Sequence, residues 1–127
     1  MKIEDILEKK NIIEKKNEEK TAELEIKSLK DIGDGKITIK SLSRKEIDEI
    51  RRLAKTEEDA NIIGVYKACV EPNLKDKEFQ KALGCRPNSY DIVEKLFTLP
   101  EIIHISDEIA VISNLEDSAD LVKKVKN

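Results

Sequence analysis

The feature that most limits the possible folds is a change of hydrophobic period within residues 22–41. In ELEIKSL and again in KITIK, aliphatic residues alternate with charged or polar ones. Alternation with a period of two is typical of a β-strand that buries one face. Between the two stretches, DIGDG supplies Asp34-Gly35, a pair that favours the backbone angles of a tight hairpin turn. The pattern predicts a β-hairpin over residues 22–41 with Asp34 and Gly35 in its turn.

Two capping signals follow the hairpin. Ser43 precedes Glu46 by three residues, which predicts a capping box at the start of a helix. Thr56 and Asp59 repeat that spacing and predict a second helix that runs to residue 70. Strand is the alternative for residues 61–70, because NIIGVYKACV is rich in β-branched residues and contains a glycine.

A proline then interrupts the chain. Pro72 cannot continue a helix, and it biases the preceding residue away from helical angles. We therefore predict an architectural corner between the central helix and the C-terminal helices, made by Glu71, Pro72, Asn73 and Leu74. Direct contact of Glu71 or Asn73 with a partner is the alternative. A short helix should follow from Asp76 and end at Gly84.

Helices are also predicted at residues 89–98 and 101–114. The second has a complete apolar stripe, formed by Ile102, Ile105, Ile109 and Ile112. Further apolar residues widen its apolar arc beyond what one core-facing side needs. Such a helix is either central in the core or presents a second face to a partner. For the second case, the predicted partner-binding residues are Ile103, His104 and Val111.

These patterns predict an α+β fold, mainly α-helical, with an N-terminal β-hairpin followed by about four to five packed helices. Residues 1–20 should form a charged N-terminal helix or extension, and residues 21–127 a single domain. Residues 118–127 could form one more helix or a frayed tail.

Composition narrows the possible functions. The net charge is −3 and the pI is about 5.4, whereas general nucleic-acid binding needs a surplus of positive charge. No apolar stretch approaches the roughly 20 residues of a membrane span, and the N-terminus lacks the apolar segment of a signal peptide. Cys69 and Cys85 therefore indicate reduced thiols in a cytoplasmic protein.

Nothing in the sequence assembles a catalytic, cofactor-binding or metal-binding motif. His104 is the only histidine, and the two cysteines are too far apart in sequence to form a zinc-binding pair. Arg44, Arg51 and Lys55 could form a DNA-recognition helix, but acidic residues on the same helix favour a self-paired charged surface. We expect no enzyme activity.

The order of motifs over residues 20–115 resembles the XkdN-like phage tail assembly chaperones. The resemblance is carried by LKDIGDGKITIKSL, SRKEIDEIRRLA, VYKACVEPNLKDKEFQKALGC and YDIVEKLFTLPEI. The chain departs from the family pattern at Pro100-Glu101, where a glycine usually intervenes, and in its Lys/Glu-rich N-terminal segment.

That resemblance implies a non-enzymatic chaperone, encoded by a phage, prophage or phage-tail-like bacteriocin. It would bind the tape measure protein and keep it soluble while the tail tube assembles. Other implied partners are the tail tube protein and a longer, frameshifted form of the chaperone itself. The implied location is the bacterial host cytoplasm, with the protein absent from the mature particle. The alternatives are a structural tail or baseplate component and a small DNA-binding regulator.

Overall fold

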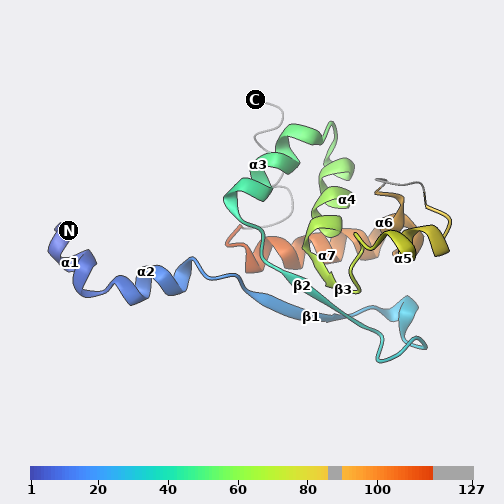
Figure 1. Ribbon diagram of the computed structural model, residues 1–127, viewed down its shortest axis with the longest axis horizontal. Coiled ribbons are helices and arrows are strands. Elements are labelled where there is room, and N and C mark those ends of the chain that lie inside the picture. Colours follow the sequence, from blue (N-terminus) through green and yellow to red (C-terminus); the bar gives the residue numbers. More distant parts are fainter. Residues whose placement is uncertain (86–89, 116–127) are drawn as a thin grey trace.

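The computed structural model describes residues 1–85 and 90–115 (Figure 1). This part of the chain forms helices and a three-stranded antiparallel sheet. The elements are α1 (Ile3–Glu8), α2 (Lys10–Lys16), β1 (Thr21–Glu25), η1 (Lys27–Leu29), β2 (Lys36–Lys40), α3 (Arg44–Leu53), α4 (Glu57–Ala68), β3 (Cys69–Glu71), α5 (Lys77–Ala82), α6 (Asp91–Leu96) and α7 (Leu99–Ile112). The prediction of a mixed, mainly helical fold is confirmed at this level. Residues 118–127 lie outside the described residues, as does the start of the helix predicted at 89–98.

The sheet has the strand order β1-β2-β3, with both pairs antiparallel. In β2, Ile37 and Ile39 are buried while Lys36, Thr38 and Lys40 are not, as the alternation predicts. The connection between β1 and β2 is longer than a tight turn, because residues 26–35 include the 3-10 helix η1. The sheet is also more than a hairpin, since β3 joins it from beyond α4.

Gly35 closes the β1–β2 connection. Its φ of +68° lies in the left-handed region, and an added Cβ would stand 2.9 Å from the Cα of Lys30. Its carbonyl accepts a hydrogen bond from Ile26 N–H at 2.8 Å, and its own N–H donates to the carbonyl of Ile32 at 3.0 Å. Beside it, Asp34 Oδ1 accepts from the backbone N–H of Lys36 at 3.0 Å. Only glycine meets both the angle and the space at this position.

Both predicted helix caps are confirmed. Ser43 and Glu46 form a reciprocal capping box at the start of α3, and Thr56 accepts a hydrogen bond from the N–H of Asp59 at the start of α4. The predicted end of the second helix is wrong, because α4 stops at Ala68. The next three residues form β3, which pairs with β2 at Ile39 and Thr38. Of the residues 61–70 for which a strand was the alternative prediction, only 69 and 70 therefore belong to a strand.

The proline corner follows a strand rather than a helix, which corrects the predicted junction of two helices. Leu74 is fully buried, and Asn73 Oδ1 accepts from the N–H of Lys75 at 3.1 Å. Asp76 then caps α5 by accepting from the N–H of Phe79. The corner thus leads from the sheet into α5, with Leu74 as its anchor in the core.

The core is aliphatic and centres on α4, which packs against α3, α6, α7 and β3. Helix α7 also packs against β1 and β2, so the sheet and α4 both contact it. Fully buried aliphatic side chains of these elements include Ile39, Ile50, Val65, Ile92, Ile105 and Ile109. Burial of such side chains is the main stabilising contribution, about 1.5–3 kcal/mol for each.

Residues 1–19, here called the N-terminal arm, extend away from this body (Figure 1). The arm contains α1 and α2, and neither helix has a buried residue. Its exposed aliphatic side chains are Ile3, Ile6, Leu7, Ile12 and Ile13. The arm meets the body at Lys20, which exchanges two hydrogen bonds with Ser41, at 2.8 and 2.7 Å.

Candidate partner-binding surface

Helix α7 begins earlier than predicted, because Thr98 and Glu101 form a capping box like that of Ser43 and Glu46. Thr98 accepts a hydrogen bond from the N–H of Glu101, and Glu101 accepts from the N–H of Thr98 at 2.9 Å. The spacing T-x-x-E at residues 98–101 is a sequence signal for this cap, three residues before the predicted start of the helix at residue 101. Pro100 occupies the first turn, where its missing N–H is tolerated.

Glu101 also links the first turn of α7 to the connection between β1 and β2. Its two carboxylate oxygens accept hydrogen bonds from the hydroxyl of Ser28 at 3.0 Å and from the N–H of Ser28 at 3.3 Å. Burial disfavours the charged form, but the hydrogen bonds from Thr98 and Ser28 outweigh it, so the pKa of Glu101 is lowered. One ionised side chain thus fixes the first turn of α7 beside η1. No local sequence signal indicates that tertiary contact.

The apolar stripe of α7 faces inward. Ile102, Ile105 and Ile109 are buried and Ile112 is partly buried, and Ala110 is buried beside them. The side chains proposed for partner binding point elsewhere: Ile103 is 43% exposed, Val111 is 58% exposed and His104 is also exposed. Leu99, which is 56% exposed, adds a fourth; it lies outside the predicted helix of residues 101–114 because α7 starts two residues earlier. Leu99, Ile103, His104 and Val111 are here called the outer face of α7.

The other predicted site residues lie in separate connections. Asp34 and Gly35 precede β2, and the corner begins at Glu71, the last residue of β3, and continues through residues 72–74. They are therefore structural elements of the sheet connections rather than members of the outer face of α7.

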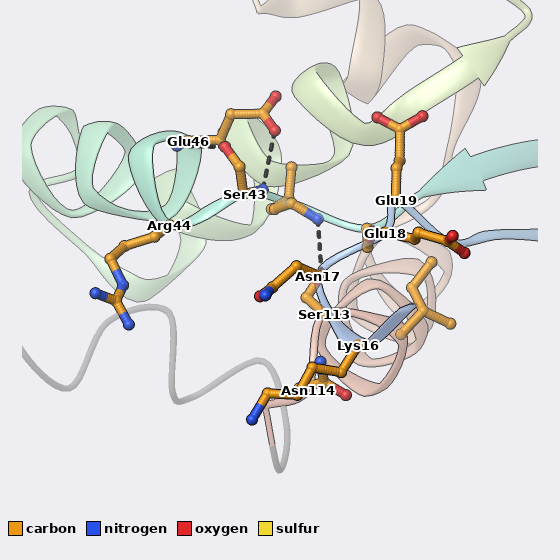
Figure 2. Close-up of a pocket in the computed structure, with 12 residues that line it drawn as sticks. Lys16, Asn17, Glu18, Glu19, Ser43, Arg44, Glu46, Ser113 and Asn114 are labelled. Carbon is orange, nitrogen blue, oxygen red and sulfur yellow. Dashed lines mark hydrogen bonds between the residues drawn. The ribbon is translucent and has the colours of Figure 1, made fainter. Parts of the chain in front are cut away.

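A polar pocket of about 320 Å³ lies where the arm meets the body (Figure 2). The backbone N–H of Leu42 donates to Ser113 Oγ at 2.8 Å, which joins the end of β2 to the end of α7. Lys40 Nζ lies 3.0 Å from Glu46 Oε2 and 3.7 Å from Glu19 Oε1. Burial opposes ionisation of Glu46, but hydrogen bonds from Ser43 and Lys40 lower its pKa. Of these contacts, the pair of Lys40 and Glu19 joins the arm to the body, and the others lie within the body.

Comparison with known proteins yields no relative. No protein-family model, no curated protein and no solved structure matches the chain. The resemblance to tail assembly chaperones therefore rests on the sequence motifs, and the function must be argued from the surface of the molecule itself.

Within residues 1–85 and 90–115, no group of three or more His, Cys, Asp or Glu side chains is arranged to hold a metal ion. None of the helices described there is long and apolar enough to cross a membrane. On α3, Asp48 lies 4.0 Å from Arg51, and Glu49 lies 3.0 Å from Lys67, so acidic groups accompany the basic ones.

Cys69 is expected to resist alkylation in the folded protein. The thiol is buried and donates to the carbonyl of Pro72 at 3.3 Å. Burial raises the pKa of Cys69 from 9.0 to about 12, although a backbone hydrogen bond at Glu71 offsets part of the effect. The thiolate fraction at pH 8 should then be roughly a thousandfold lower than in the unfolded chain. Iodoacetamide labelling followed by mass spectrometry, with and without urea, measures this protection. Equal labelling rates in both would contradict it.

Proposed function

We propose that this protein is a non-enzymatic phage tail assembly chaperone that binds the tape measure protein through the outer face of α7. The observation that supports this proposal is the exposure of Leu99, Ile103 and Val111 on a helix whose apolar stripe is already buried. Large aliphatic side chains gathered on one exposed helix face favour a protein partner.

The chemistry of the surroundings suits a chaperone. Asp107 lies one turn from both Ile103 and Val111, and Glu108 lies one turn from His104 and Val111, so partly exposed carboxylates accompany these aliphatic side chains on the same helix. An apolar contact with a charged rim can hold an aggregation-prone helix while the complex stays in solution. On this proposal the protein acts in the bacterial host cytoplasm, leaves before the particle matures, and can also meet the tail tube protein or a longer, frameshifted form of itself.

The test is the double substitution Ile103→Asp/Val111→Asp. Both side chains are exposed, so the variant should fold and melt as the natural protein does. Its binding of the tape measure protein should fall by roughly tenfold or more, because interface anchors are worth about 2 kcal/mol each. Circular dichroism melts report folding, and co-purification of the co-expressed tape measure protein reports binding.

Leu53→Asp is the matched control, because Leu53 is another exposed aliphatic residue at 39% but lies at the end of α3. It should retain binding. If the double variant folds and holds its partner as well as this control does, the outer face of α7 is not the binding surface. Detection of the protein in purified particles would instead support a structural tail component.

A further inference from the structure

The N-terminal arm has an apolar side that its own chain does not cover. The arm extends away from the body, and every one of its residues is exposed (Figure 1). Three aliphatic residues share one face of α1, because they are spaced at i, i+3 and i+4, and two more lie on α2. In chain order these five are Ile3, Ile6, Leu7, Ile12 and Ile13, with exposed fractions between 39% and 72%.

The two helices of the arm are too short to be stable by themselves. Helix α1 has 6 residues and α2 has 7, whereas isolated helices shorter than about 12–15 residues are marginal in water. Short helices in proteins usually persist because an apolar face packs on another element. Neither arm helix has a buried residue, so the covering element must come from another molecule.

The charges of the arm indicate which molecule that is. All charged side chains of α1 are acidic, whereas α2 has three basic side chains and one acidic; they are Glu4, Asp5 and Glu8 on α1, and Lys10, Glu14, Lys15 and Lys16 on α2. Two arms side by side in parallel would bring like charges together. An antiparallel pair lays the acidic helix of each copy beside the basic helix of the other, so the arm is complementary to a second copy of itself.

The bend in the arm is compatible with such a pair. The helix is interrupted at Lys9, where φ is −120° and ψ is 31°, and α1 and α2 therefore run in different directions (Figure 1). A two-fold axis through the bend exchanges α1 with α2, so each helix of one copy still lies along the opposite helix of the other.

We propose that the N-terminal arm pairs with the arm of a second copy of this chain in an antiparallel, two-fold symmetric dimer. In a register centred between residues 9 and 10, Ile6 lies opposite the partner's Ile13. The same register sets Glu4 opposite the partner's Lys15. The apolar sides of both arms are then covered, and the acidic and basic side chains flank them in opposite pairs.

The dimer should be weak. Stable specific interfaces bury roughly 1,200–2,000 Å² in total, and five aliphatic side chains from each copy fall short of that area. Lys9 and Lys10 of the two copies also come close to the axis and repel each other. We expect a dissociation constant on the order of 10–100 µM.

Sedimentation velocity of the full chain tests this directly. Between about 5 and 500 µM, the chain should pass from monomer to dimer with a midpoint in the expected range. A monomer at every concentration, as expected if the arm folds onto its own body instead, overturns the inference.

Two matched sets of variants place the contact on the arm. Ile6→Asp/Ile13→Asp should leave the thermal melt of the body unchanged, because both side chains are exposed, and should weaken dimerisation by roughly a hundredfold or more. Ile32→Asp is the control, since Ile32 is 69% exposed but lies between β1 and β2. This control and Ile103→Asp/Val111→Asp should both dimerise as the natural protein does. A dimer that survives the arm substitutions, or that is lost with those on α7, overturns the inference.

A charge exchange tests the antiparallel arrangement. Glu4→Lys/Glu8→Lys makes both arm helices net basic, and Lys15→Glu/Lys16→Glu makes both net acidic. Each variant alone should dimerise roughly tenfold more weakly than the natural protein. An equimolar mixture should recover a heterodimer, because each α1 again lies beside an α2 of opposite charge. Recovery also shows that the single losses do not come from unfolded helices, whereas a mixture that stays monomeric contradicts the pairing. No tape measure protein enters these measurements, so their outcome is independent of the proposed function.

Discussion

Replacing Ile105 with alanine is expected to lower the free energy of unfolding by about 3–4 kcal/mol. Ile105 is fully buried on the inner side of α7, the helix that contacts both α4 and the sheet. Truncation removes apolar burial and leaves a cavity that close-packed neighbours fill only in part. Urea unfolding followed by circular dichroism measures the change.

Two variants on the same helix serve as controls. Ile105→Val removes one methylene group and should lower the free energy of unfolding by about 1 kcal/mol. Val111→Ala, at an exposed position, should change it by less than about 0.5 kcal/mol. Similar losses for Ile105→Ala and Val111→Ala would mean that α7 does not dock through this face.

Replacing Gly35 with valine should also lower the free energy of unfolding, by about 2–4 kcal/mol. The φ of +68° is strained for a β-branched residue, and the new Cβ would press against backbone, 2.9 Å from the Cα of Lys30. Neither problem can be relieved by a side-chain rotation. Thermal and urea unfolding should show the loss, together with a weakened β1–β2 pairing.

The variant Gly33→Val separates the two contributions to the loss, which are the backbone strain and the contact of the new Cβ with Lys30. Gly33 also has a positive φ, +56°, but an added Cβ would meet nothing within 4 Å. This variant should therefore lose only the part that arises from backbone strain, about 1–2 kcal/mol. Equal losses at the two glycines would show that the contact with Lys30 relaxes at little cost.

Local interactions account for what could be predicted from the sequence. The caps at Ser43 and Thr56 depend on residues three positions apart, and the buried stripe of α7 follows from helical periodicity. The exposure of Ile103 and Val111 follows from the same periodicity, because a side chain off the stripe of a docked helix faces outward.

Contacts between distant residues account for what was missed. Strand β3 forms because Cys69 and Glu71 pair with β2, about thirty residues earlier, so no local pattern distinguishes it from the end of α4. The hydrogen bond between Ser28 and Glu101 likewise joins two residues that lie 73 positions apart in the sequence.

The N-terminal arm gives this molecule two parts under different evolutionary constraints. A substitution in the core must preserve close packing, because every buried side chain has several neighbours that depend on its shape. No side chain of α1 or α2 is buried, so residues there can change without disturbing that packing. The length of the arm and the pattern of its aliphatic residues can thus change without altering the packing of the body. Natural variation confined to the arm would then follow whatever the arm contacts, independently of the fold that carries it.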